Sequence, residues 1–243
     1  MSVILAGVLG VALWIAVALH DDPRPDVAKA ARSEPARTAD RAAAARMDRQ
    51  LDQLRAALPW ATHLGTAVAD SCTTDTVPHT GFARTRWTAV TCTRTATAYL
   101  AFDGDFRREL GQLDTVLAAA GWKPGDEPGD QPGLVAACDH LHRADGRPDE
   151  ATVWYTPPIP SDFVLPSGDG AYPRGPSATV RAVQAPGLPN VDDGTDVHDR
   201  ALENPSGGTY FVDWQPYSRT RLSAAYPAHG AVLAVTVRVP YNT

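Results

Sequence analysis

The segment Cys138-Asp-His-Leu-His142 places a thiol and two imidazoles close together in the chain. We predict a β-strand over residues 134–143. Alternate side chains of a strand share one face, so Cys138, His140 and His142 would point the same way. Zinc and copper accept imidazole and thiolate ligands, and a further ligand could come from a neighbouring strand. Solvated or hydrogen-bonded histidines are the simpler explanation of this pattern, and a catalytic pair of Cys138 with His140 is a third.

Cys72 and Cys92 lie in two runs rich in threonine, alanine and valine, at residues 66–75 and 85–102. The proline- and glycine-containing stretch between these runs has the composition of a turn, so we predict a β-hairpin. In that hairpin the numbers of opposed residues sum to about 164, which places Cys72 opposite Cys92 within reach of a disulfide. Two buried reduced thiols are the alternative, and the third cysteine could also pair with either of them. A disulfide indicates an oxidising compartment.

The acidic run Asn190–Asp199 is the remaining group of possible metal ligands. Carboxylates on a glycine-containing loop can bind calcium, but Pro189 and Val191 stand where an EF-hand loop requires ligands. An exposed acidic loop is therefore the main interpretation. The chain lacks a nucleophile elbow, a zinc-protease helix, a Walker loop and a dinucleotide-binding turn, so we predict no catalytic and no cofactor-binding residue.

An uninterrupted apolar run occupies residues 3–19. A helix of that length rises about 26 Å, slightly less than the hydrocarbon core of a bilayer, so the run predicts a single-pass transmembrane anchor within residues 1–20. Alanines at positions 16 and 18 also fit a signal-peptidase site, and cleavage after Ala18 would give a secreted protein. A buried core helix is the third possibility.

The basic residues near this run argue against export of the domain that follows it. Arg24, Lys29 and Arg32 follow the run and no basic residue precedes it, a pattern that by the positive-inside rule keeps the following domain in the cytoplasm. Acidic residues alternate with these bases, however, and long domains cross membranes largely regardless of charge. The predicted disulfide therefore decides for an extracytoplasmic domain.

Residues 21–58 are predicted to be a polar linker followed by a stalk helix. Leucine or methionine recurs at helical spacing along it, at Met47, Leu51, Leu54 and Leu58. This stripe would either cap the following domain or bind a partner helix. Pro59 and Trp60 would then begin the folded domain, residues 59–243.

The domain is predicted to be α+β, with a mainly antiparallel sheet and helices on one face. The clearest helix spans residues 105–122, with Asp103 or Asp105 as N-cap and Gly121 as its end. Further strands are expected at 134–143, 151–156, 178–184, 209–214, 220–226 and 231–239, the first two as a second hairpin. The proline-rich segment 157–176 reads as a long irregular loop.

The net charge of −6 makes nucleic acid an improbable partner, because an acidic surface repels phosphate. Basic charge is almost entirely arginine, and alanine is abundant. In composition and architecture the chain resembles uncharacterised membrane-anchored or secreted proteins of actinobacteria.

These observations together predict a membrane-tethered extracytoplasmic domain that binds or assists other molecules without catalysis. Its membrane contact would be residues 3–19, and a protein partner would use the stalk helix or the 157–176 loop. The alternative is an extracytoplasmic metal-binding protein or metal-dependent enzyme that holds zinc or copper at His140 and His142.

Overall fold

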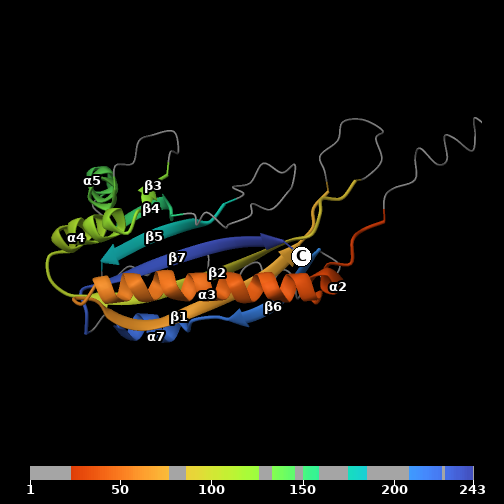
Figure 1. Ribbon diagram of the computed structural model, residues 1–243. Coiled ribbons are helices and arrows are strands. Elements are labelled where there is room, and N and C mark those ends of the chain that lie inside the picture. The colour runs from red at the N-terminus through yellow and green to blue at the C-terminus, as the bar shows by residue number, and fades with distance from the viewer. Residues whose placement is uncertain are drawn as a thin grey trace, which may run out of the picture.

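The hairpin predicted from the two threonine-rich runs forms two neighbouring interior strands of a seven-stranded sheet (Figure 1). The computed structural model describes residues 23–76, 86–125, 133–145, 150–158, 175–184, 208–225 and 228–242. Its strands are β1 (Thr62–Thr73), β2 (Thr91–Phe102), β3 (Lys123–Pro124), β4 (Glu150–Thr156), β5 (Ser177–Gln184), β6 (Thr209–Gln215) and β7 (Ala231–Asn242). They follow the order β3-β4-β5-β7-β2-β1-β6, and neighbouring strands are antiparallel throughout.

The described helices are α2 (Val27–Ala31), α3 (Glu34–Ala57), α4 (Phe106–Ala119), α5 (Leu134–Asp145) and α7 (Arg219–Ala225). Helices combined with a mainly antiparallel sheet confirm the α+β class. None of these helices is long and apolar enough to cross a membrane, and the run at residues 3–19 lies outside the described part of the chain.

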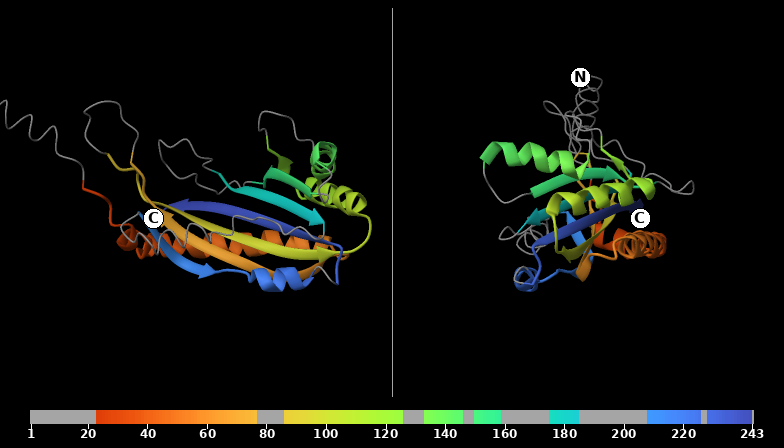
Figure 2. Two further views of the ribbon diagram at one scale, coloured as in Figure 1. Left: turned by 180° about the vertical axis from the view of Figure 1, so that it is seen from behind. Right: turned by 90° about the vertical axis from the view of Figure 1, so that its left-hand side faces the viewer.

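The two faces of the sheet carry separate apolar clusters, because alternate residues of a strand point to opposite sides. On β2, Ala98 and Leu100 belong to the larger cluster, which also includes buried apolar residues from α2, α3, α4 and α5. Tyr99 and Ala101 belong to a smaller cluster with Leu222 of α7. Helices therefore lie on both faces, with α3 and α7 on opposite sides (Figure 2), and the prediction of helices on one face was wrong.

The predicted stalk helix is part of the core. α3 begins after Ser33, whose hydroxyl oxygen accepts from the Ala36 N–H, and Pro35 stands in its first turn. Its predicted stripe of Met47, Leu51, Leu54 and Leu58 is buried against the sheet, chiefly against β7 and β2. The packed core thus begins well before residue 59, and the apolar stripe has its partner within the chain.

α4 follows the prediction closely. Asp105 is the N-cap, and its carboxylate accepts a hydrogen bond from the Arg108 N–H at 2.8 Å. Phe106, Leu110 and Leu113 are buried, and Gly121 ends the helix with φ of 79°, a left-handed conformation that favours glycine.

Two predicted strands are helices instead. Residues 134–143 lie in α5, which buries Leu134, Ala137 and Cys138 at helical spacing, so the second hairpin does not form. β4 pairs with β3 and β5 instead. Residues 220–226 were expected to form a strand, but α7 spans Arg219–Ala225 and buries Leu222 and Ala225, three residues apart on one face.

Candidate functional site

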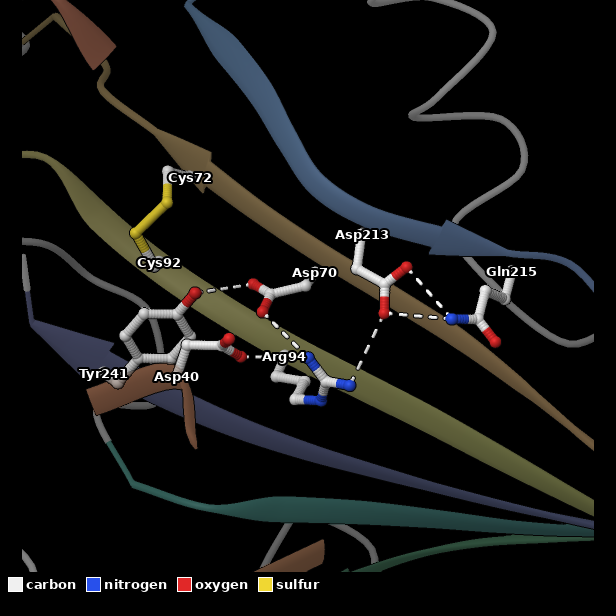
Figure 3. Close-up of polar contacts among 8 residues, drawn as sticks. All are labelled: Asp40, Asp70, Cys72, Cys92, Arg94, Asp213, Gln215 and Tyr241. Atoms are coloured by element: carbon white, nitrogen blue, oxygen red, sulfur yellow. Dashed lines mark hydrogen bonds and ion pairs between the residues drawn. A yellow bond between two sulfur atoms is a disulfide. The ribbon is translucent and has the colours of Figure 1, made fainter. Parts of the chain in front are cut away.

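The most connected polar group in the described residues lies beneath α3, between that helix and the sheet (Figure 3). We call it the Asp70 cluster. Five residues from five elements form it: Asp40 of α3, Asp70 of β1, Arg94 of β2, Asp213 of β6 and Tyr241 of β7.

Arg94 is the cation of this cluster, and it faces three carboxylates. Its guanidinium lies 2.9 Å from Asp40, 3.2 Å from Asp70 and 3.6 Å from Asp213. The Tyr241 hydroxyl donates to the second oxygen of Asp70 at 2.7 Å. At the outer end, the Gln215 amide donates to both oxygens of Asp213, at 3.1 and 3.2 Å. With every carboxylate ionised, one positive charge would face three negative charges.

Burial makes this imbalance costly at Asp70, whose side chain has no exposed surface. Burial, together with hydrogen bonding and repulsion from Asp40, raises the pKa of Asp70 to about 7, although Tyr241 and Arg94 act in the opposite direction. The pKa of Tyr241 is raised above its usual value by burial and by the neighbouring Asp70 charge. The Tyr241 proton therefore stays on the phenol, where it serves as a hydrogen-bond donor.

This arrangement can hold or release a proton near neutral pH, but a substrate cannot meet Asp70 while α3 covers it. Asp40 and Asp213 keep 23% and 32% of their side-chain surface exposed, so the rim of the cluster contacts solvent while Asp70 itself does not. The geometry shows directly that ion pairs and hydrogen bonds link α3 to four strands of the sheet.

The disulfide predicted between Cys72 and Cys92 is present, and the strand register places the two cysteines directly opposite each other. Both are fully buried. Cys72 follows Asp70 by two residues on β1, and Cys92 precedes Arg94 by two residues on β2. The disulfide therefore closes the hairpin next to the Asp70 cluster.

The residues of the CDHLH segment do not share a strand face, because the segment is part of α5. Residues two apart on a helix are separated by about 200°, so the argument that aligned Cys138, His140 and His142 no longer stands. Cys138 is a buried thiol in the core, and Asp139 forms an ion pair with Arg107 of α4. Within the described residues no group of three or more His, Cys, Asp or Glu side chains is placed to hold a metal ion.

α5 is held at its start by an aspartate from another helix. The Asp114 carboxylate of α4 accepts hydrogen bonds from the Leu134 and Val135 N–H groups, at 2.9 and 3.3 Å. It also accepts from the Tyr155 hydroxyl of β4 at 2.9 Å. A carboxylate at a helix N-terminus satisfies free N–H groups and interacts favourably with the helix dipole. Gly133, with φ of 109°, provides the turn into this cap.

Two predicted loops, at residues 157–176 and at Asn190–Asp199, lie largely or wholly outside the described residues. The Asp70 cluster was not predicted, although a signal for part of it was present. Residue numbers 70 and 94 fit the same hairpin register as Cys72 and Cys92, and the structure pairs Asp70 with Arg94. The contributions of Asp40, Asp213 and Tyr241 depend on long-range packing that the register does not contain.

Comparison of the chain with protein-family models, with curated proteins and with solved structures finds no match.

Proposed function

We propose that this protein is a membrane-tethered, extracytoplasmic domain that binds or assists another molecule and does not itself catalyse a reaction. The observation that carries this proposal is the Cys72–Cys92 disulfide. Structural disulfides persist in oxidising compartments and are rare in the cytosol of most organisms. The apolar run at residues 3–19 would provide the tether, or a signal sequence if it is cleaved after Ala18.

The positions of the Asp70 cluster and of Trp154 support a binding role. The Asp70 cluster is enclosed between α3 and the sheet, where it supports packing. On the surface, by contrast, Trp154 of β4 exposes 50% of its area. Exposed tryptophan is typical of contact surfaces, because its large ring buries much area when a partner covers it. Trp154 also stands just before the 157–176 loop, which we propose as the neighbouring part of that surface.

The compartment is tested by the redox state of the cysteines in cells. Because Cys72 and Cys92 are buried, cells expressing the full chain are quenched in acid, and the proteins are alkylated under denaturing conditions, reduced, and alkylated with a second reagent. We expect the second reagent on Cys72 and Cys92 and the first on Cys138. A matched chain that lacks residues 1–20 is the control, and it should carry the first reagent on all three. Reduced Cys72 and Cys92 in the full chain would contradict the proposal.

The binding surface is tested by photo-crosslinking. A photoreactive amino acid replaces Trp154 in one variant and the exposed Asp48 of α3 in another. We expect discrete crosslinked species, larger than the protein itself, from position 154 alone. The same species from both positions, or none from position 154, would count against this surface.

A further inference from the structure

The two halves of α3 are attached to the sheet by different means. The C-terminal half buries Met47, Leu51 and Leu54, whereas the N-terminal half buries only the small side chains of Ala36 and Ala43. Burial of large apolar side chains stabilises contact far more than burial of alanine, because the free energy follows the apolar area removed from water. The N-terminal half must therefore depend more on its polar contacts.

The main polar contact of that half is Asp40, which lies between the two buried alanines and reaches Arg94 at 2.9 Å. Arg94 also forms ion pairs with Asp70 and Asp213, so three carboxylates share its positive charge. When Asp70 is neutral, two carboxylates face one guanidinium. When Asp70 is ionised, a third negative charge is buried beneath α3. Movement of the helix away from the sheet would let water solvate this charge.

We propose that the Asp70 cluster is a proton-dependent latch, which holds the N-terminal half of α3 on the sheet when Asp70 is protonated and loosens it when Asp70 is ionised. The groups that face Asp70 are Asp40 from α3, Arg94 from β2, Asp213 from β6 and Tyr241 from β7. Tyr241 and Arg94 remain donors across the neutral pH range, so the Asp70 proton is what changes. A pKa near 7 at Asp70 places the change between mildly acidic and neutral conditions.

The direction follows from linkage. The closed form holds the Asp70 proton more tightly than an open form with a solvated carboxylate does. Closure is therefore favoured at low pH and weakens as pH rises toward 7. In the sequence α3 follows the proposed tether, with α2 between them. If the proposed function holds, the latch would therefore make the attachment of the domain to its tether depend on the pH outside the cell. The latch itself does not depend on where the domain resides.

Hydrogen exchange on the full chain tests the latch. Amide exchange is measured at pH 5 and pH 7.5 and corrected for intrinsic rates, and peptides covering residues 34–44 are compared with peptides covering 47–57. We expect the opening of residues 34–44 to rise tenfold or more between the two pH values, since each pKa unit corresponds to a factor of ten. Residues 47–57 should change little.

In the variant Asp70→Asn the rise in residues 34–44 should disappear. Asp48→Asn, an exposed aspartate on the same helix, should behave like the wild type. If Asp70→Asn does not fold, the variant Asp40→Asn at the cluster rim should reduce the rise by removing the carboxylate that repels Asp70. Equal rises in both halves of α3, an unchanged response in the variants, or no pH dependence in the wild type would each overturn the proposal.

Discussion

Two aspartates in this protein, Asp70 and Asp114, each accept a hydrogen bond from a strand tyrosine, and each belongs to a group of polar contacts that holds a helix in place. Asp114 receives its other hydrogen bonds from backbone N–H groups at the start of α5. Asp70 instead shares one guanidinium with two further carboxylates beneath α3. Neutral, fixed donors stabilise the part-buried carboxylate of Asp114 without any added charge. The shared cation at Asp70 instead leaves an excess of negative charge that a proton can relieve.

The disulfide adjoins only the Asp70 site. Its removal is the largest loss of stability that we expect from substitution at a fixed pH. The variant Cys72→Ala/Cys92→Ala should lower the free energy of unfolding by about 3 kcal/mol, because the unfolded chain loses a closed loop of about 20 residues. Denaturant titration measures this difference. Reductant should lower the stability of the wild type toward that of the variant and leave the variant unchanged, so a wild type indifferent to reductant would contradict the disulfide.

Removal of the Asp114 carboxylate is expected to rank next. The variant Asp114→Ala should lower the free energy of unfolding by about 2 kcal/mol, because two N–H groups of α5 and the Tyr155 hydroxyl lose their acceptor. Hydrogen exchange should localise the loss to α5. The control Asp52→Ala removes an exposed carboxylate paired with Arg55, and should change stability by less than about 0.5 kcal/mol. Similar losses in both variants would argue against a cap at Asp114.

The two tyrosines provide the smallest effects and the most direct comparison of the sites. At pH 8, Tyr241→Phe should cost about 1 to 2 kcal/mol, because it removes a donor from a buried and charged Asp70. Tyr155→Phe should cost about 0.5 to 1 kcal/mol, because Asp114 keeps its backbone donors. Both are measured by denaturant titration, and an equal or larger loss in Tyr155→Phe would reverse the comparison.

The features that were predicted correctly, the β1–β2 hairpin and α4, have clear signals in their own local sequence. Composition and turn chemistry predicted the β1–β2 hairpin, and its register led to the Cys72–Cys92 disulfide. An N-cap, a regular stripe and a terminal glycine predicted α4. In both regions, neighbouring residues in the chain contain most of the information that determines the structure.

α5 shows why other regions could not be predicted. The sequence from Leu134 to Arg143 alternates enough to fit a strand, and its helix-initiating carboxylate is Asp114, twenty residues earlier in the chain. When the capping residue belongs to another helix, the sequence next to α5 contains no N-cap signal. The same holds for the Asp70 cluster, whose residues come from five separate elements. The stripe of α3 was recognised, but only the structure identifies the sheet as its partner.

The free energy of unfolding as a function of pH tests the role of Asp70 most directly. The folded state holds the Asp70 proton up to about pH 7, whereas the unfolded state releases it near its ordinary pKa. The stability that this proton provides is complete at low pH and is lost as pH rises toward 7. Relative to Asp70→Asn, the wild type should therefore lose about 2 to 4 kcal/mol between pH 4 and pH 7.5. A constant difference between the two proteins, or a wild type that gains stability over the variant as pH rises, would contradict this account and show that the ion pair with Arg94 outweighs burial.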